Sequence, residues 1–326
     1  MHPAYIDPHT GETFTLDTPR WCGTAHAPLL ITQLPGITRD RIDTKTRSLW
    51  RYQASFPLPV MDPITLGEGC TPLVPRRIHG TEVLIKCEWF MPTGSFKDRG
   101  ASVMLSMLRQ QGIHSVLEDS SGNGGAAISC YAAAGGMAAT IMAPSSTSPA
   151  KTVQMRAHGA AVELIPGNRQ ATSDAAVARA SEIFYASHNW QPFFLQGTKT
   201  LAYELWEDLG FQAPDNVIVP CGAGSNVLGL EIGFSELLRA GLEGPVLVVA
   251  GTTAISQLAP DWAVALGSVG WKHRVRAFGG RATSREVSAL AAEAVRWQAR
   301  VIVAAGGGQA IDAARAAATS AGLPLV

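Results

Sequence analysis

The sequence predicts an α/β protein with parallel sheets, and two observations lead to this fold class. Short apolar runs rich in β-branched residues alternate with Ala-rich stretches of helical length, which is typical of buried parallel strands joined by right-handed helical crossovers. The 326 residues are also enough for two domains with one large core, or for one large domain with an extension. Strands are expected at residues 115–117, 138–142, 162–165, 217–219, 246–250 and 301–304.

The first part of the chain is expected to support the main body. Residues 1–51 are rich in Pro, Thr and Asp with weak periodicity, and they predict an extension that packs on that body. Residues 1–16 lack the basic-then-apolar pattern of a signal peptide, so export is not expected. Residues 66–74 indicate a loop that leads into an extended segment, and residues 82–87 predict a strand that delivers the next loop.

The charge balance favours a small-molecule ligand. Lys plus Arg and Asp plus Glu are equal at 26 each, so no net field attracts nucleic acid or an anionic membrane. The five cysteines are scattered and never form a Cys-x-x-Cys pair, which indicates reduced thiols in the cytoplasm. Cys22 and His26 have the spacing of half a zinc site, but two further ligands are missing nearby, so no metal is expected.

A long uncharged run is interpreted as buried structure. Residues 120–150 contain no charged side chain, and that length alone is compatible with a membrane span. Several glycines and Pro144 interrupt the run, and alanine is its commonest residue. A buried helix followed by a buried strand is therefore the better interpretation.

The loop at residues 92–100 holds a lysine at an unusual place. Ser95 and Asp98 have the spacing of a capping box, and the uncharged residues 101–108 predict a buried helix, so Lys97 falls in its first turn. The positive end of the helix disfavours an ammonium there and favours the free amine, which is the form that attacks aldehydes. The alternative is a solvated first-turn lysine, and these nine residues alone leave both open.

Two further loops follow predicted strands, where ligands of parallel sheets bind. The loop at residues 120–125 carries donors suited to a carboxylate on Ser120 and Ser121, and Asn123 offers a donor and an acceptor. The loop at residues 221–226 precedes a predicted helix, and its amides form a cradle for a phosphate smaller than a nucleotide. Each loop alone is also compatible with a plain Gly-rich turn. Together with the lysine they specify pyridoxal phosphate.

With these loops, the chain resembles the threonine-synthase-like group of pyridoxal-phosphate enzymes, which have the fold of the tryptophan synthase β-subunit, or fold type II. The similarity begins at residues 48–52, continues through residues 67–73 and the three loops, and runs to about residue 250. The loops occur in the family's order and spacing. The resemblance implies two three-layer αβα domains with the cofactor between them.

The resemblance also implies a role for each loop residue. Lys97 would hold the cofactor through a Schiff base, Phe96 would pack at its ring, and Asn123 would meet its 3′-oxygen. Ser120 and Ser121 would bind the substrate carboxylate. The phosphate would be held by Gly222, Ala223, Gly224, Ser225 and Asn226.

The implied domains are an N-terminal extension at residues 1–51, a large cofactor domain at residues 52–100 with 196–326, and a small mobile domain at residues 101–195. The last part departs from the family. Its members carry a Ser or Thr before a late Gly-x-Gly, where the hydroxyl bonds the pyridine nitrogen. Either Ala305 occupies that position here, or residues 301–314 match the preceding strand and helix, and neither register supplies a hydroxyl.

The implied activity is a lyase reaction of amino acid metabolism, a β- or γ-elimination or replacement on a small amino acid. A substrate amine would displace Lys97, which would then remove the α-proton. An ammonia-lyase acting on threonine, serine or a related hydroxy amino acid is a second interpretation. A non-catalytic protein that binds the cofactor or a partner is a third, supported by the missing hydroxyl. A homodimer is left open.

The distal end of the substrate is expected to be uncharged or weakly polar. Threonine synthases act on a phosphorylated homoserine and usually carry an arginine for its phosphate before a Gly-x-Lys-Thr segment. Phe194 stands at that place, unless it and Phe193 form a plain core strand, and a phenyl ring does not pair with a dianion. Arg169 is the nearby residue that would substitute. His188 or Asn189 is expected to bond the distal group.

Overall fold

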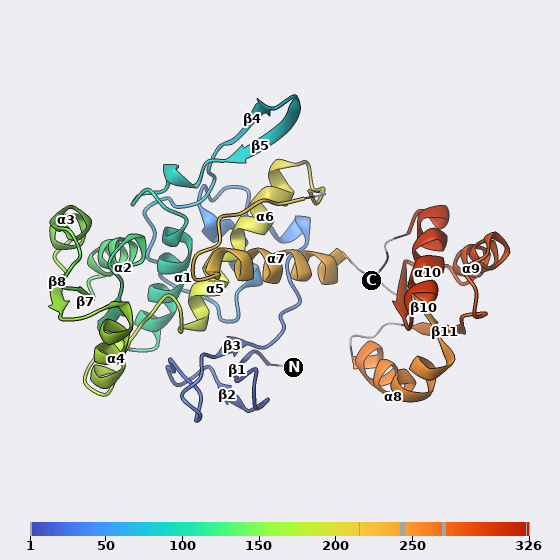
Figure 1. Cartoon of the computed structure of the whole chain (residues 1–326), viewed down its shortest axis with the longest axis horizontal. Coiled ribbons are helices and arrows are strands. Elements are labelled where there is room, and N and C mark those ends of the chain that lie inside the picture. The colour runs from blue at the N-terminus through green and yellow to red at the C-terminus, as the bar shows by residue number, and fades with distance from the viewer. Residues whose placement is uncertain (1, 215, 242–244, 269–271, 324, 326) are drawn as a thin grey trace. The chain divides into compact units, whose positions relative to one another are not determined.

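The structure is a computed structural model that describes residues 2–214, 216–241, 245–268, 272–323 and 325 (Figure 1). Internal contacts divide the chain into two compact units, unit 1 at Met1–Leu237 and unit 2 at Leu238–Val326. Both units contain a parallel sheet with helices, so the predicted α/β class is confirmed. The domain boundaries expected from the sequence stay a prediction.

Unit 1 begins with a small antiparallel sheet that the sequence did not predict. Its strands are β1 (Ala4–Ile6), β2 (Thr13–Thr15) and β3 (Leu30–Ile31), in the order β2-β1-β3. Two 3₁₀-helices follow, η1 (Arg39–Arg41) and η2 (Leu49–Ser55). Tyr5, Leu29 and Trp50 from this segment are buried in the same apolar cluster as the helix that carries Lys97. The N-terminal segment therefore contributes to the main core of unit 1.

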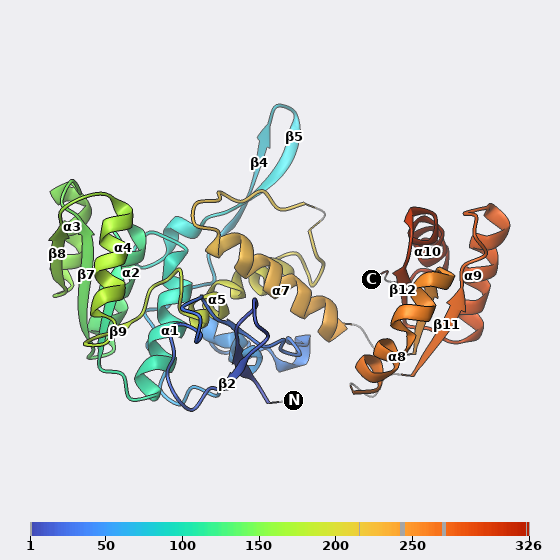
Figure 2. The same cartoon turned by 60° about the horizontal axis from the view of Figure 1, so that its bottom comes forward.

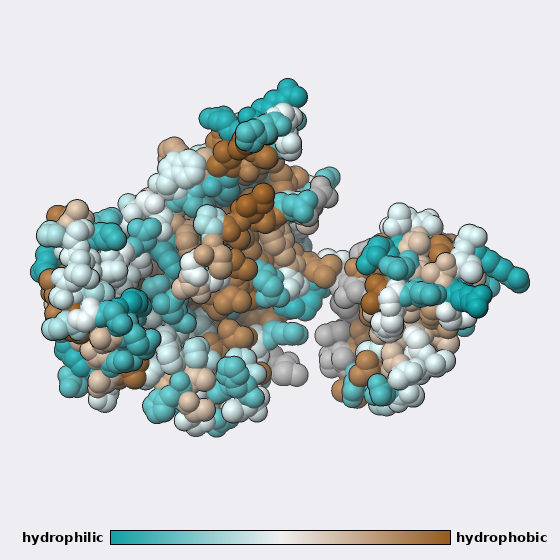
Figure 3. All heavy atoms as spheres, viewed as in Figure 1, coloured by the Kyte–Doolittle hydropathy of each residue, from teal (hydrophilic) through white to brown (hydrophobic). Residues whose placement is uncertain are grey.

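A hairpin delivers the lysine loop. Strands β4 (Leu73–Ile78) and β5 (Thr81–Lys86) pair antiparallel around a turn in which His79 and Gly80 both have positive φ. Figure 1 shows this hairpin extending from unit 1, and Figure 3 shows its outer part as hydrophilic. The 3₁₀-helix η3 (Glu88–Phe90) and the lysine loop then lead into helix α1 (Lys97–Gln110).

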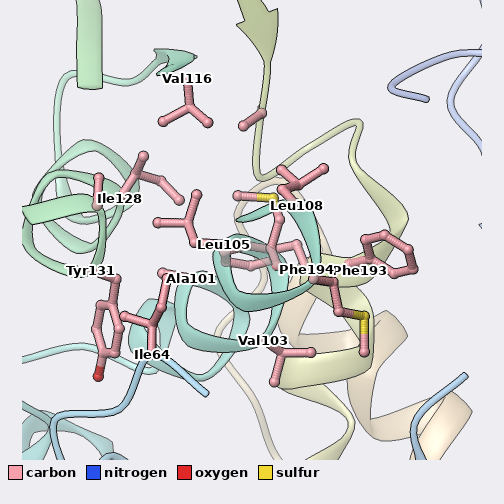
Figure 4. Close-up of a cluster of buried hydrophobic side chains, with 14 of the residues drawn as sticks. Ile64, Ala101, Val103, Leu105, Leu108, Val116, Ile128, Tyr131, Phe193 and Phe194 are labelled. Atoms are coloured by element: carbon pink, nitrogen blue, oxygen red, sulfur yellow. The ribbon is translucent and has the colours of Figure 1, made fainter. Parts of the chain in front are cut away.

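Helix α1 is the central helix of unit 1. All its residues from Asp98 to Leu108 are buried, and these include the uncharged residues 101–108 for which a buried helix was predicted. Figure 4 shows α1 between helix α2 (Asn123–Ala134) and helix α5 (Pro192–Thr198). The approach to α5 is close, because a Cβ at Gly197 would lie 2.0 Å from the carbonyl oxygen of Arg99. Any larger residue there forces the two helices apart.

The parallel sheet of unit 1 has the order β8-β7-β6-β9. Its strands are β6 (Ser115–Asp119), β7 (Ala138–Pro144), β8 (Ala161–Ile165) and the short β9 (Phe184–Tyr185), of which all but β9 were predicted. Val116 and Ile141 pack with α2 and with α3 (Pro149–Ala157). Leu117 and Met142 pack on the other face, against α4 (Arg169–Arg179). The sheet is thus covered on both faces, a three-layer arrangement visible in Figure 2.

The predicted strand at residues 217–219 is wrong. After helices α5 and α6 (Thr200–Asp208), residues 216–220 form no strand, and the side chain of Ile218 is 98% exposed. A β-branched run becomes a strand only where a neighbour supplies ladder hydrogen bonds, and no described strand pairs with this one. The run leads instead, through the loop at residues 221–224, into helix α7 (Ser225–Gly241).

Unit 2 is a second three-layer body. Strands β10 (Val246–Ala250), β11 (His273–Ala277) and β12 (Val301–Ala305) are parallel in the order β11-β10-β12. One face packs on α9 (Ser284–Arg296) and α10 (Gly308–Ala321), and the other packs on α8 (Thr252–Ser268) (Figure 1). The sequence predicted β10 and β12 but not β11. The turn after β12 contains Gly306, whose φ of +136° strains any other residue.

The described residues contain no helix that is both long enough and apolar enough to cross a lipid bilayer. Within the same described ranges, no group of three or more His, Cys, Asp or Glu side chains has an arrangement suited to a metal ion. The Sγ atom of Cys22 lies 3.9 Å from Nδ1 of His26, and both are partly or fully exposed.

Candidate active site

Lys97 lies in the first turn of α1, and its side chain reaches the start of α7. The Nζ atom donates a hydrogen bond to Oγ of Ser225 over 2.9 Å. It also lies 5.0 Å and 5.3 Å from the ring centroids of Phe96 and Phe194. Burial lowers the pKa of Lys97 to about 8, although the negative charge of Glu118 opposes this shift. About a tenth of the Lys97 side chains are therefore nucleophilic free amine at pH 7, far more than for an ordinary lysine.

The expected capping box between Ser95 and Asp98 is wrong. The Ser95 hydroxyl accepts a hydrogen bond from the backbone N–H of Lys97 over 3.2 Å. The Asp98 carboxylate turns back to Thr93, where it accepts the backbone N–H over 2.7 Å and also the hydroxyl. These two donors of Thr93 outcompete the single N–H that a capping box offers. Desolvation is the main cause of the lowered pKa of Lys97.

The loop before α7 has the properties of an anion site. The backbone N–H groups of residues 222–226 have no hydrogen-bond partner among the described residues. Gly224 has a φ of +92°, and a Cβ at Gly222 or Gly224 would meet no atom within 4 Å. The Oδ1 atom of Asn226 is buried and also without a described partner, so one end of this amide is unused. Free N–H groups at a helix start attract a phosphate, and the loop fits the phosphate of the expected cofactor.

Ser225 joins this loop to the lysine. Its backbone begins α7, and its hydroxyl accepts the hydrogen bond from Lys97. Gly222 and Ala223 are exposed, whereas Ser225 and Asn226 are buried. Pyridoxal phosphate carries an aldehyde and a phosphate on one small ring. Unit 1 thus offers an amine for the aldehyde and a set of free N–H donors for the phosphate.

A cluster of rings lies beside Lys97. Phe194 is fully buried on α5, with its ring against Gly100, where a Cβ would lie 2.5 Å from three ring carbons. The ring centroid of His188 is 5.7 Å from that of Phe194. The alternative of a plain core strand at Phe193 and Phe194 is wrong, because both residues lie in a helix that begins at Pro192. Phe194 therefore forms one wall next to the amine of Lys97.

The loop at the end of β6 meets the same cluster. Ser120 is buried and Ser121 is half-buried, and Asn123 is the exposed first residue of α2. A Cβ at Gly124 would lie 2.8 Å from Nδ1 of His188 and 3.0 Å from Oγ of Ser120. The absence of a side chain at Gly124 lets the His188 ring and the Ser120 hydroxyl come together.

Two predicted substrate residues have other surroundings. Asn189 is exposed, and its backbone N–H donates to the Ser187 hydroxyl over 3.3 Å. Arg169 lies at the start of α4 and forms an ion pair with the buried carboxylate of Asp119. A substrate phosphate at Arg169 would therefore have to compete with an internal carboxylate. Of the two distal candidates, His188 is the one that contacts the ring cluster beside Lys97.

The sequence did not point to Glu118. This carboxylate is fully buried on β6, and its oxygens accept hydrogen bonds from the backbone N–H and from the ring of His188. The sequence signal was the pair of charged residues, Glu118 and Asp119, at the end of a strand that a sheet buries. Its partner lies 70 positions further along the chain, so no local motif connects the two.

Comparison with known proteins identifies the family. Residues 64–325 match the family model for pyridoxal-phosphate dependent enzymes, so the chain belongs to that family, and its cofactor is pyridoxal 5′-phosphate. Threonine synthase from Methanosarcina acetivorans is 30% identical over 225 residues, covering 67% of this chain and 55% of the relative. Threonine synthase from Methanocaldococcus jannaschii is 32% identical over 216 residues, covering 63% and 53%. The chain spans about half the length of the curated relatives it matches.

The solved structures agree on the architecture. O-ureido-L-serine synthase is similar with a TM-score of 0.50 at 20% identity, covering 82% of this chain and 90% of that one. An O-ureido-L-serine-bound mutant of the same enzyme also has a TM-score of 0.50, at 21% identity with 82% and 88% covered. At this identity the likeness concerns the fold alone. With the family match, it gives the chain the fold type II architecture that the sequence predicts.

Proposed function

We propose that the protein is a lyase that catalyses a β- or γ-elimination or replacement on a small amino acid, in the manner of a threonine synthase. The observation that carries this proposal is the hydrogen bond from Lys97 to Ser225. It brings the amine with a lowered pKa to the loop whose N–H groups are free for a phosphate. Amine and phosphate site are the two attachment points that this cofactor needs.

Residues of unit 1 would bind the cofactor and transfer the proton. When bound, pyridoxal phosphate supplies an electron sink for the bond broken at the substrate α-carbon. The loop at residues 222–226 would hold its phosphate, Phe96 would pack at its ring and Asn123 would meet its 3′-oxygen. Lys97 would hold it through Nζ, and the same atom would accept the substrate α-proton and later return a proton.

The substrate end of the site is formed by the β6 loop and the ring cluster. Ser120 and Ser121 bind the substrate carboxylate near the start of α2. Phe194 and His188 face the distal end, so the proposed substrate has an uncharged or weakly polar side chain. The phosphate ester of homoserine is a less favourable substrate, because Phe194 offers no charge and Arg169 is already paired with Asp119.

Two other functions have an observation in their favour. An ammonia-lyase acting on threonine or serine fits the polar His188 beside an otherwise apolar wall. A non-catalytic cofactor-binding or partner-binding protein fits the turn after β12, where Ala305 is followed by Gly306 and Gly307 and no hydroxyl occupies the family's position.

Product analysis with purified, cofactor-loaded protein separates these functions. The panel contains O-phosphohomoserine, serine, threonine, homoserine and O-acyl derivatives of the hydroxy amino acids. We expect turnover of an uncharged substrate and little of the phosphate ester. If the protein turns over the phosphate ester efficiently and Arg169→Ala loses this activity, the protein acts as a threonine synthase. No product from any member, with cofactor bound, would favour the non-catalytic function.

A further inference from the structure

The Glu118 carboxylate has an arrangement that structural support alone does not require. It is fully buried at the carboxyl end of β6, and both its oxygens are used by one residue. Oε2 accepts the backbone N–H of His188 over 2.9 Å, and Oε1 lies 2.8 Å from Nδ1 of the same residue. A bidentate contact of this kind fixes the backbone and the ring plane of His188 together.

The fixed ring is placed at the substrate end of the site. Its Nδ1–Cε1 edge lies over Gly124, where a Cβ would come within 2.8 Å of Nδ1 and 2.9 Å of Cε1. Its face is tilted at 58° to the ring of Phe194, whose other neighbour is Nζ of Lys97 at 5.3 Å from the ring centroid. Nε2 has no hydrogen-bond partner among the described residues, and it is not one of their fully buried unpaired atoms. Nε2 is therefore available to a ligand.

The contact also determines the ring's tautomer. The backbone N–H of His188 is always a donor, so Oε2 of Glu118 must accept. An ionised Glu118 has only acceptors, so Nδ1 must carry a hydrogen toward Oε1. In a neutral imidazole with hydrogen on Nδ1, Nε2 is a hydrogen-bond acceptor.

We propose that Glu118 is a positioning residue that holds His188 with Nδ1–H toward itself and Nε2 toward the substrate, so that the site selects a small amino acid with a side-chain hydroxyl. This inference rests on the proposed function and names its substrate class. A hydroxyl donates to Nε2, whereas an ether or ester at the same place presents only acceptors. An acceptor facing an acceptor leaves both atoms without a hydrogen-bond partner beside the buried His188 ring.

Glu118→Gln tests the tautomer of His188 directly. Glutamine keeps the shape of the glutamate side chain but has only one oxygen that can accept a hydrogen bond. If that oxygen serves the backbone N–H of His188, the amide NH₂ faces Nδ1. Imidazole then moves its hydrogen to Nε2, since the backbone N–H cannot change its role. The variant therefore turns Nε2 from an acceptor into a donor.

The first experiment measures the tautomer directly. Protein with ¹⁵N-labelled histidine, purified with its cofactor, is compared by NMR with the Glu118→Gln variant, and the His188 signals are those missing in His188→Asn. We expect hydrogen on Nδ1 in the wild type and on Nε2 in Glu118→Gln. Hydrogen on Nε2 in the wild type overturns the proposal, and this result does not depend on any activity or on the folding of a variant.

The second experiment measures selection with matched substrates. Serine is compared with O-methylserine, and homoserine with O-methylhomoserine, because methylation removes the donor while water and methanol are similar leaving groups. We expect kcat/KM to favour the hydroxyl compound by about tenfold or more in the wild type. In Glu118→Gln the preference falls toward equality, because a donor at Nε2 serves both oxygens.

Glu163→Gln is the matched control, since Glu163 lies on the next strand but one and pairs with Arg179. It should leave both the tautomer and the substrate preference unchanged. A wild-type preference for the ethers overturns the substrate class. A preference that persists in Glu118→Gln after the tautomer has changed overturns the role of Nε2. No turnover of any pair, with hydrogen on Nδ1 intact, contradicts the proposed function and the selection while the positioning by Glu118 stands.

Discussion

The Nζ atom of Lys97 lies 2.9 Å from Oγ of Ser225, although the two residues are 128 positions apart in the chain. This contact joins the first turn of α1 to the first residue of α7. It places an amine that burial has made less basic beside a helix start whose N–H groups are free. Three of the predictions below test the parts of this arrangement separately.

The reactivity of Lys97 should rise with pH around a midpoint of about 8. Because burial lowers its pKa from 10.5 to about 8, the neutral amine becomes the major form above that pH, well before an ordinary lysine deprotonates. The measurement is the rate at which cofactor-free protein is labelled by an amine-selective reagent, followed by peptide mass. The exposed Lys151 in the same sample is the internal reference. A midpoint near 10 for Lys97 would show that its side chain is solvated.

Gly224→Asp should weaken cofactor binding without unfolding the protein. The new carboxylate would stand among N–H groups placed for an anion, and losing charged hydrogen bonds there costs about 1.5–3 kcal/mol each. Equilibrium binding of pyridoxal phosphate measures the effect. Gly136→Asp is the control, because Gly136 also has a positive φ and open space around it but lies in the turn after α2. Equal affinities of the two variants for pyridoxal phosphate would show that the loop does not bind the cofactor.

Phe194→Ala and Phe193→Ala should differ in function but not in stability. Both rings are fully buried on α5, so each truncation should lower the free energy of unfolding by about 3–5 kcal/mol. Phe193 packs on Tyr5, with ring centroids 5.5 Å apart, whereas Phe194 stands next to Lys97. Only Phe194→Ala should therefore admit water to Lys97 and raise its labelling midpoint. A raised midpoint in both variants would indicate a general loosening of the core.

Glu204→Gln should destabilise the protein at neutral pH but less in acid. Burial opposes ionisation of Glu204, yet the charges of Arg99 and Lys86 outweigh it and lower its pKa to about 2. The pKa of Glu204 in the folded protein lies below its ordinary value of 4.5. The ionised carboxylate therefore contributes fully to the free energy of unfolding above pH 4.5, and this contribution disappears as the pH falls toward 2.

Breaking this buried pair should cost about 3–5 kcal/mol at pH 7. Urea unfolding of wild type and Glu204→Gln at several pH values measures the difference between them. The difference should shrink below about pH 4.5. Glu163→Gln, which removes a more exposed pair, serves as the reference. A difference for Glu204→Gln that stays constant down to pH 3 would contradict the low pKa.

The sequence predicted the strands that helices cover on both faces. Strands β7, β8, β10 and β12 and the predicted start of β6 are mostly apolar and lie between helices, so their composition identifies them as strands. Strand β11 was missed because arginines at 274 and 276 break its apolar run. The run at residues 217–219 has the composition of a strand but no described partner, and pairing is not visible in local sequence.

Among the site residues, those in short local motifs were predicted, and those whose role depends on distant parts of the chain were not. Lys97 and the loop at residues 222–226 were recognisable because short motifs follow predicted strands or start predicted helices. Glu118 was not, because its role depends on a partner 70 residues away. The environment of Phe194 was likewise missed, since its closeness to Lys97 comes from the packing of α5 on α1 through Gly100 and Gly197.

The central claim is that Lys97 is the residue that holds the cofactor, and covalent trapping tests it most directly. Protein loaded with pyridoxal phosphate is reduced with borohydride, which makes the attachment permanent, and the modified peptide is identified by mass. We predict that the added mass lies on Lys97 and that Lys97→Ala loses both this label and the visible absorption of the bound cofactor, while Lys151→Ala keeps both. A label on another lysine, or an unchanged spectrum in Lys97→Ala, would contradict the account.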